Sequence, residues 1–315
     1  MPEGNIIHRI ARVHRQWLVG RGFTADSPQG RFSREARRLS GRTLLGVEAH
    51  GKHLFHRFEG GVLLHIHLGL FGHLRHFRAG APPPSPACRL RLASPHATFH
   101  LAGPQACELL SPEAEAELRS RLGEDPLSPD ASPARAFEAL RRGRTPLAAA
   151  LLDQERIAGV GNILRAEALF LARLPPLRPA SELRPAEFER LWEALRHLME
   201  DAARDGRIVA PHAPPASWET PGRRREDRFS VYDRAGQPCP RCATPVSRVA
   251  LAGRGLFFCP TCQATGSSDT PARGPRAAPS ARTRPSRTTA APAGSPGGRS
   301  TGGSGTAGSA PSRVP

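Results

Sequence analysis

Four cysteines near the end of the chain constrain its fold more than any other feature. They form two Cys-x-x-Cys pairs, Cys239 with Cys242 and Cys259 with Cys262, and sixteen residues separate the pairs. This spacing is typical of a tetrahedral zinc site made of four cysteines. Because about 30 residues cannot stabilise a fold by burial alone, the metal would replace a hydrophobic core. The spacing therefore predicts one structural zinc ion. A pair of disulfides is the alternative, and a reducing compartment disfavours it.

The residues between the two cysteine pairs predict a β-hairpin. Its strands would run from Val246 to Leu251 and from Leu256 to Phe258, with Ala252-Gly253-Arg254-Gly255 at the tip. Arg254 lies between two glycines, so its guanidinium could approach a phosphate or enter a nucleic-acid groove. The alternative interpretation of Arg254 is an ordinary solvated arginine in a turn.

The hydrophobic pattern divides the preceding chain into a β-rich part and a helical part, with a boundary near residues 123–132. An amphipathic helix from Glu3 to about Leu18 comes first. Short apolar runs then predict an antiparallel sandwich or barrel, with strands at Thr43–Val47, His53–Phe58, Val62–His67, Leu74–Phe77 and Leu90–Leu92. Helices are expected at Ala134–Arg141, Leu147–Leu152, Leu164–Leu171 and Pro185–Asp201.

The charge of the chain indicates a polyanionic partner. The formal net charge is +17 and the sequence pI is about 11.4, which favours nucleic acid or an acidic membrane surface. No apolar run is long enough to span a membrane, and no secretory signal is visible at the N-terminus. We therefore expect a cytoplasmic, nucleoid-associated protein with no membrane partner. Residues 266–315, which are rich in Pro, Gly, Ser, Thr, Ala and Arg, predict a disordered basic tail.

The chain has a single lysine, Lys52, against 44 arginines. Arginine can serve almost everywhere a surface cation is needed, but it cannot supply a compact, titratable ammonium group. Lys52 follows Gly51 and precedes an apolar stretch. This isolation favours a functional role for Lys52, and the alternative is chance survival of one lysine in an arginine-biased composition.

The chain begins Met1-Pro2-Glu3-Gly4. Removal of Met1 would leave Pro2 as a free secondary amine next to a carboxylate. An α-amine titrates near pH 7.7–8, so a fraction of it is neutral at pH 7 and can attack a carbonyl or a sugar C1′ carbon. A secondary amine then forms an iminium that keeps its charge. The alternative is that proline only begins the first helix.

A glycine-containing turn before Asn162 is a second candidate for a phosphate site. A helix that starts near Asn162 would offer free backbone N–H groups and an amide, and Gly159 and Gly161 permit close backbone approach. The alternative is a simple turn between helices. Four histidines lie close together in the sequence, but their spacing resembles a metal site only loosely, and we assign them no catalytic role: His65, His67, His73 and His76.

These features together resemble the formamidopyrimidine-DNA glycosylase and endonuclease VIII family. The resemblance covers residues 2 to about 264 and rests on motifs in order: Met1–Gly4, Gly51–Lys52, His67–Leu70, Leu151–Phe170, Val231–Gly236 and Cys239–Gln263. The opening Pro-Glu-Gly is similar to the endonuclease VIII branch. The purine-directed branch typically continues Pro-Glu-Leu-Pro-Glu, and Ile6 stands here in place of its second carboxylate.

The resemblance implies an α+β multidomain fold. It would comprise an N-terminal antiparallel β-sandwich with a flanking helix (2–124), a helix–two-turn–helix module (133–222) and a four-cysteine zinc finger with a β-hairpin (229–264), followed by the disordered tail. The implied partner is double-stranded DNA with a damaged base or an abasic site, bound by a monomer with the damaged nucleotide flipped out.

The family's roles carry over onto matching residues of this sequence. Pro2 would be the nucleophile at C1′, Glu3 the general acid at the sugar ring, and Lys52 a catalytic and phosphate-contacting cation. Asn162 and Arg254 would hold the phosphates that flank the lesion. Leu70 stands where a methionine often fills the space left by the flipped base.

The implied activity is that of a bifunctional glycosylase and abasic-site lyase, mainly for oxidised pyrimidines, that cleaves the strand by β,δ-elimination. Two alternatives stay within the enzyme class: an oxidised-purine glycosylase, or chiefly an abasic-site lyase. The alternative outside it is a zinc-dependent protein that binds damaged DNA without cutting it.

Overall fold

The computed structural model describes residues 2–78, 80–211 and 225–264, which belong to one compact unit. The expected disordered tail, residues 266–315, lies outside the described residues. Within the described part, no helix is both long enough and apolar enough to cross a membrane.

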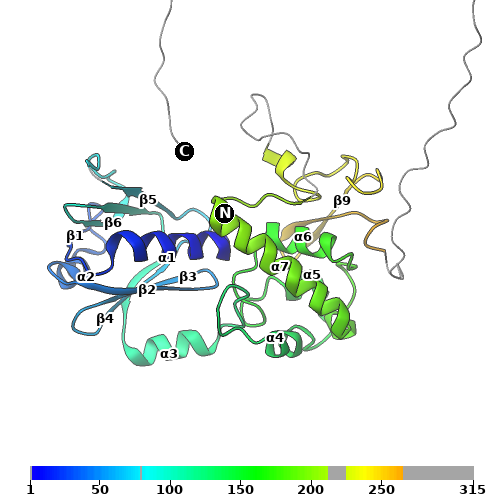
Figure 1. The fold of residues 1–315 in the computed structure, drawn as a ribbon, viewed down its shortest axis with the longest axis horizontal. Helices are drawn as coiled ribbons and strands as arrows, with labels where there is room; N and C mark the ends of the chain where they lie inside the picture. Colours follow the sequence, from blue (N-terminus) through cyan, green and yellow to red (C-terminus); the bar gives the residue numbers. More distant parts are fainter. Residues whose placement is uncertain (1, 79, 212–224, 265–315) are drawn as a thin grey trace, which may run out of the picture. The chain divides into compact units, whose positions relative to one another are not determined.

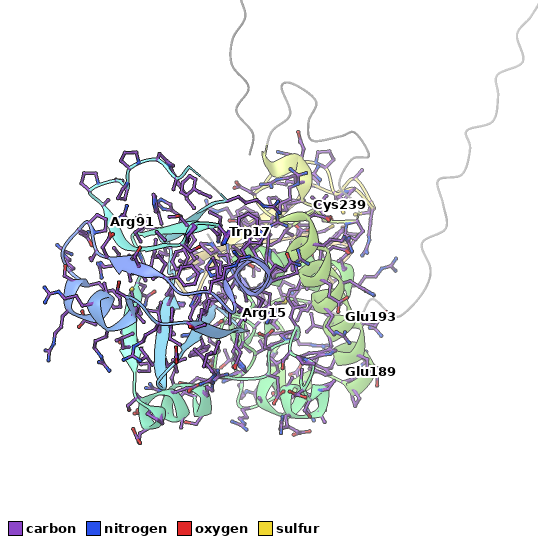
Figure 2. The ribbon with its side chains drawn as sticks, turned by 60° about the vertical axis from the view of Figure 1, so that its left-hand side comes forward. Arg15, Trp17, Arg91, Glu189, Glu193 and Cys239 are labelled. Carbon is purple, nitrogen blue, oxygen red and sulfur yellow. The ribbon has the colours of Figure 1, made fainter. Side chains whose placement is uncertain are left out.

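The first helix is confirmed as α1 (Gly4–Leu18). Its buried face includes Ile7, Ile10 and Ala11, which join the core of the β-rich part. Trp17, which is labelled in Figure 2, is half-buried on this helix. The guanidinium of Arg78 lies over its ring, 4.8 Å from the ring centre. The helix begins at Gly4 with Glu3 as its N-cap residue. Pro2 therefore lies before the cap, and not in the first helical turn where proline is favoured.

Two four-stranded antiparallel sheets form the β-sandwich (Figure 1). One sheet has the order β2 (Leu44–His50), β3 (His53–Phe58), β4 (Val62–His67) and β8 (Ala106–Leu110). The other has the order β1 (Thr24–Asp26), β6 (Cys88–Ala93), β7 (Thr98–Ala102) and β5 (His73–Phe77). Their shared core contains Leu54, Leu64, Ile66, Leu90 and Phe99, all inaccessible to solvent.

Five elements of this part were absent from the sequence-based expectation: β1, β7, β8, α2 (Ser33–Leu39) and α3 (Pro112–Ser120). The strands β7 and β8 are five residues each, and His100 or Glu108 interrupts the apolar pattern. The helix α3 did carry a signal, because Ser111 caps it through its hydroxyl and Pro112 occupies its first position.

The helical part contains α4 (Pro133–Leu140), α5 (Leu147–Ala150), α6 (Asn162–Leu171), the 3-10 turn η1 (Ala180–Glu182) and α7 (Pro185–Asp205). The predicted helices are confirmed, and α7 extends to the glycine Gly206, whose φ of 82° ends it in a left-handed cap. A single core joins α4, α5, α6 and α7 through residues such as Leu140, Leu164 and Leu195.

The last described segment holds the 3-10 turn η2 (Arg225–Arg228) and the hairpin of β9 (Ser247–Leu251) and β10 (Arg254–Phe258). The hairpin is confirmed, but its tip is shorter than expected. Ala252 and Gly253 alone form the turn, both with positive φ, and Arg254 pairs with Leu251 as the first residue of β10. The backbone of Arg254 is therefore held in the sheet, while its side chain is exposed.

Candidate active site

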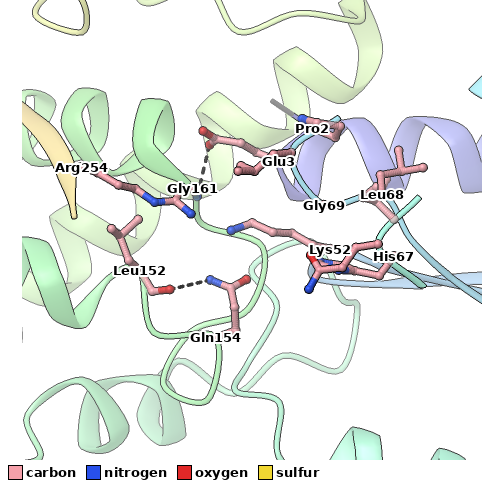
Figure 3. Close-up of a pocket in the computed structure, with 13 residues that line it drawn as sticks. Pro2, Glu3, Lys52, His67, Leu68, Gly69, Leu152, Gln154, Gly161 and Arg254 are labelled. Atoms are coloured by element: carbon pink, nitrogen blue, oxygen red, sulfur yellow. Dashed lines mark hydrogen bonds between the residues drawn. The ribbon is translucent and has the colours of Figure 1, made fainter. Parts of the chain in front are cut away.

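A cavity of about 330 Å³ opens where the β-sandwich meets the helical part (Figure 3). Segments far apart in the sequence line it: the start of α1, the start of β3, the end of β4, the loop before α6, and the hairpin. The lining includes Pro2, Glu3, Lys52, Leu70 and Arg254, five of the residues expected from the sequence. In Figure 3 the amine of Lys52 and the guanidinium of Arg254 point into the same space below Glu3.

Glu3 occupies the N-terminus of α6. Its carboxylate accepts hydrogen bonds from the backbone N–H groups of Gly161 (3.2 Å), Ile163 (2.8 Å) and Leu164 (3.1 Å). The expectation that these groups are free to hold a phosphate is therefore wrong. The N–H groups at the positive end of α6 instead bind the carboxylate of Glu3. Burial raises the pKa of Glu3, against the opposing effects of the three N–H groups and of Lys52.

Glycines make this close approach sterically feasible. A Cβ atom at Gly161 would overlap the Glu3 carboxyl group. Gly4, Gly51 and Gly159 meet in a second contact, in which the N–H of Gly4 donates to the carbonyl of Gly159 at 2.9 Å. A Cβ at Gly4 would lie 2.8 Å from the Cα of Gly159, and a Cβ at Gly51 would lie 2.9 Å from its nitrogen. The backbones of α1, the β2–β3 turn and the loop before α6 are thus packed against each other.

Lys52 enters the cavity from the β2–β3 turn. Its ammonium donates to the carbonyl of Val160 at 2.7 Å, and Gln154 donates to the same carbonyl at 3.0 Å. Burial lowers the pKa of Lys52 to about 8; Glu3 opposes this shift, and the charge of Arg254 adds to it. The only lysine of the chain therefore lines the cavity with its pKa held well below that of an ordinary lysine.

A buried carboxylate fixes the turn that carries Lys52. Asp125 is fully inaccessible and accepts hydrogen bonds from the N–H of Gly51 at 2.6 Å, from Leu127 at 2.9 Å, and interacts with the His8 ring at 2.6 Å. Burial would raise the pKa of Asp125, but His8 and the backbone donors outweigh it and hold the pKa below its usual value. Nothing in the sequence pattern singled out Asp125.

Asn162 does not face the cavity as an available amide. Its Nδ2 donates to the carbonyl of Gly255 at 3.0 Å, and its Oδ1 accepts from the guanidinium of Arg165. Arg165 is fully buried and also donates to the carbonyls of Ala148 and Gly255. Burial lowers the pKa of Arg165 to about 10. In this structure, Asn162 connects α6 to the hairpin that presents Arg254.

Two exposed apolar side chains lie next to each other in the β4–β5 turn, and Leu70 of this pair lines the cavity. Leu70 is 53% exposed and its neighbour Phe71 is 85% exposed. Single exposed apolar residues are common, but two neighbouring ones beside a cavity form a contiguous apolar surface. Leu70 was expected from the sequence and Phe71 was missed, although an aromatic residue within a glycine-bounded turn is itself a signal of binding.

The four cysteines predicted to bind zinc come together. The Sγ atoms of Cys239, Cys242, Cys259 and Cys262 all lie within 4.8 Å of one another. Zinc–sulfur bonds of about 2.3 Å in a tetrahedron place the sulfurs roughly 3.8 Å apart, so the four thiols fit a zinc ion. Among the described residues, no other cluster of this kind occurs. Cys239 and Cys259 are buried against Phe170 of α6, which links this centre to the helix that holds Glu3.

Of the four histidines that lie close together in the sequence, only His67 lines the cavity, and His73 is exposed on β5. His14, His56 and His76 form a hydrogen-bonded chain with two contacts of 2.7 Å. His65 is buried and interacts with Glu108 at 2.9 Å. Burial lowers the pKa of His56 to about 3 and that of His76 to about 4.

Comparison with known proteins gives matches along the described chain. Residues 1–108 match the formamidopyrimidine-DNA glycosylase N-terminal domain, and residues 122–211 match the H2TH domain of the same enzyme. Residues 236–265 match the zinc finger found in FPG and IleRS. With the cluster of four cysteines, this last match indicates a structural zinc site.

Individual relatives belong to the same group of enzymes as the matched domains. Endonuclease 8 1 of Mycobacterium tuberculosis is 39% identical over 272 residues, which are 84% of this chain and all of the relative. Formamidopyrimidine-DNA glycosylase of Thermus thermophilus is 39% identical over 238 residues, 72% of this chain and 84% of the relative. The crystal structure of the MutM (Fpg) protein from Thermus thermophilus superposes with a TM-score of 0.67 at 35% identity, and covers 84% of this chain and all of that one.

The fold and the matched domains define a DNA glycosylase with abasic-site lyase activity, an enzyme of base excision repair. The chain belongs to the formamidopyrimidine-DNA glycosylase and endonuclease VIII family.

Proposed function

We propose that this enzyme removes oxidised bases, mainly pyrimidines, from double-stranded DNA and then cleaves the strand by β,δ-elimination. One observation carries the proposal: Pro2, Glu3 and Lys52 line the same cavity. These residues are a potential amine nucleophile, a carboxyl group with a raised pKa, and a cation that titrates near pH 8. The pyrimidine preference rests on the Pro-Glu-Gly opening and its similarity to the endonuclease VIII branch.

The proposed reaction begins at the sugar C1′ of a flipped nucleotide. The Pro2 nitrogen forms a bond to C1′ and gives up its N–H proton, and the base leaves with the electron pair of the glycosidic bond and takes up a proton. Glu3 gives its proton to the ring oxygen O4′ as the C1′–O4′ bond opens, which yields an iminium. Loss of a C2′ proton then expels the 3′ phosphate, and loss of a C4′ proton expels the 5′ phosphate. The iminium accepts electrons in both steps.

The cations around the cavity would hold the DNA during these steps. Arg254 is exposed at the cavity, and its guanidinium can form charge-assisted bonds to a phosphate. For Asn162, whose amide is engaged with Gly255, a phosphate contact requires exchange of that bond on DNA binding. Leu70 and Phe71 are suited to fill the space left by the flipped base, because apolar side chains stack well between bases.

The substrate test is a set of duplexes that differ in one nucleotide. Thymine glycol, 5-hydroxycytosine, dihydrouracil, 8-oxoguanine and an abasic site are incubated with enzyme in excess, and the rate of strand cleavage is measured for each. Faster cleavage at the three pyrimidine lesions than at 8-oxoguanine supports the proposal. The reverse order establishes a purine-directed enzyme, and cleavage at the abasic site alone establishes a lyase. Binding without any cleavage refutes the enzymatic mechanism.

The pH dependence follows from two titrations with opposite signs. The Pro2 amine must be neutral to attack, so the rate rises with pH through about 7.7–8. Lys52 is charged below its pKa of about 8, so a role as a cation is lost as pH rises through that value. We expect a bell-shaped profile of single-turnover base excision with a narrow maximum near pH 8. Lys52→Arg keeps the charge at all pH values and should remove the part of the alkaline limb that Lys52 contributes, leaving the part set by loss of the Glu3 proton. An unchanged alkaline limb in that variant would assign it to another group.

We propose one structural zinc ion per chain, held by the four cysteines, in a monomer located in the cytoplasm with the nucleoid. The Cys239→Ser variant should lose its zinc and most of its DNA binding, because the metal replaces the core of the hairpin that presents Arg254. Metal content by mass spectrometry and DNA affinity are the two measurements. Cys88→Ser is the matched control, since Cys88 is buried in β6 far from the cluster in sequence. Full DNA affinity in zinc-free Cys239→Ser would contradict the structural role.

A further inference from the structure

A group of exposed arginines on and just before α2 has no role in the cavity. We define the α2 arginine cluster as Arg31, Arg34, Arg37 and Arg38, all four of which are exposed. The buried residues Phe32, Ala36 and Leu39 pack into the core of the sandwich, and so attach the side of α2 away from these arginines. The helix is therefore rigidly attached, and the guanidinium groups project from a fixed base.

The cluster differs from the arginines of α3 and α7 in its lack of acidic partners. Arg119 and Arg121 on and just after α3 pair with Glu115 and Glu117 one turn away, and Arg196 on α7 pairs with Glu200. The surface of α7 also carries acids such as Glu189 and Glu193, which lie along its outer side in Figure 2. The arginines of α1 also lack carboxylate partners, but Arg9, Arg12 and Arg15 donate to backbone carbonyls, whereas no such bond holds the cluster arginines among the described residues.

Nothing among the described residues neutralises the α2 cluster. No ion pair joins any of its four arginines to a carboxylate within residues 2–78, 80–211 and 225–264. The single acid of α2, Glu35, is half-buried, and Asp26 on the adjoining strand β1 is paired with Arg91. Arg34 and Arg38 are four residues apart, and like charges at this spacing destabilise a helix. The repulsion among these positive charges is reduced when phosphates bind to the cluster.

The cluster lies away from the proposed reaction site. The cavity contains the N-terminal end of α1, with Pro2, Glu3 and Ile7 in its lining. The chain reaches α2 after the C-terminal end of the same helix, and Figure 1 shows α2 beyond that end. A helix of 15 residues is about 22 Å long. The two sites are thus separated by roughly the length of six base pairs of DNA, at about 3.4 Å per pair.

We propose that the α2 arginine cluster is a second DNA-binding surface, which holds the phosphate backbone of double-stranded DNA outside the lesion cavity. This proposal rests on the proposed function, because it assumes that the polyanion bound by the enzyme is DNA. Because guanidinium groups bind phosphate oxygens without reading bases, this surface contributes affinity and salt dependence but no lesion preference. The DNA held there is either a distant arm of the damaged duplex or a separate segment.

The test uses the full chain in three forms. In the first, the four cluster arginines become glutamine. The second is a control with the same change in charge, in which ion-paired arginines elsewhere become glutamine: Arg121, Arg135, Arg196 and Arg204. In the third, the four cluster arginines become lysine, which keeps the charge. Affinity for an undamaged 40-base-pair duplex is measured against salt concentration.

The slope of log affinity against log salt should become shallower by about 0.9 for each phosphate that the protein no longer neutralises. We expect this change in the glutamine variant of the cluster, a smaller one in the control, and recovery in the lysine variant. Equal slopes for the two glutamine variants would overturn the proposal. Single-turnover excision from a saturated damaged duplex should be unchanged in the cluster variant, so a failure of the α2 surface is distinguishable from a failure of the proposed enzymatic function.

Duplex length identifies the source of the bound phosphates. An abasic-analogue duplex with five base pairs on each side of the lesion is too short to reach α2, and one with twenty on each side is long enough. A slope difference between wild type and the cluster variant that appears only with the long arms places the same duplex on α2. A difference that appears on addition of a second, undamaged duplex to the short complex places a separate segment there. No difference in either setting refutes the surface.

Discussion

An enzyme with a blocked N-terminus will form no borohydride-reducible cross-link with abasic-site DNA, whereas the chain that begins at Pro2 will be trapped. Only two kinds of amine are available, because the chain has one lysine and arginine does not form Schiff bases. Both Pro2 and Lys52 line the cavity, so geometry alone does not separate them. We expect the attachment at Pro2, because Glu3 adjoins it for proton transfer, whereas the Lys52 ammonium donates to the carbonyl of Val160.

The trapping experiment compares a chain with a short N-terminal extension and the same extension at the C-terminus. We expect complete loss of the cross-link in the first and no loss in the second. Lys52→Arg should still be trapped, although its base excision is slower. Peptide mapping of the reduced adduct locates the attachment. A cross-link at Lys52, or trapping that survives the N-terminal extension, refutes the assignment of Pro2 as the nucleophile.

Gly161→Ala should be nearly inactive in base excision although it adds one methyl group. The new Cβ would overlap the Glu3 carboxyl group, which must then leave the N-terminus of α6. Loss of a positioned general acid lowers the rate by about 10²- to 10⁴-fold. Overpacking at a closed site also costs about 1–3 kcal/mol of stability. The rate is measured with enzyme in excess, and stability by urea unfolding.

Two comparison variants make the Gly161 result interpretable. Gly22→Ala is the steric control, because a Cβ at Gly22 would meet no heavy atom within 4 Å. Glu3→Gln keeps one acceptor oxygen for the α6 N–H groups, replaces the other by an NH2 donor, and removes the acid. If Gly161 acts by positioning Glu3, the alanine variant will resemble Glu3→Gln, with base excision lost and trapping on abasic DNA retained in part. Normal excision by a folded Gly161→Ala enzyme would show that the Glu3 position is not required.

The sequence was most informative where chemistry leaves a local pattern. The cysteine spacing predicted the cluster of four thiols, and alternating or helical periodicity located β3, β4 and α7 within a few residues. Strands such as β7 were missed because polar residues break their short apolar runs. Arg254 was expected at a free tip, and the two-residue turn instead places it inside β10.

The candidate site was harder to predict because its contacts join distant segments. The hydrogen bonds from Ile163 and Leu164 to Glu3 span about half of the chain, and no local pattern indicates them. The same holds for Asp125, which lies in a linker by sequence and beneath the Lys52 turn by structure. Asn162 was correctly predicted to lie at the start of a helix. Its amide was expected to be open to solvent, but it donates to a backbone carbonyl of the hairpin.

The hydrogen bonds of Glu3 have a consequence for how the molecule could be divided. A fragment that ends after the β-sandwich would expose the carboxylate without its N–H donors, and a fragment that starts at the helical part would expose the bare beginning of α6. Neither half could contain a formed reaction centre. Co-expressed halves should recover activity only if they reassociate through the contacts of Glu3 with residues 161–164. The carboxyl group that acts as the acid therefore also connects the two structural parts of the enzyme.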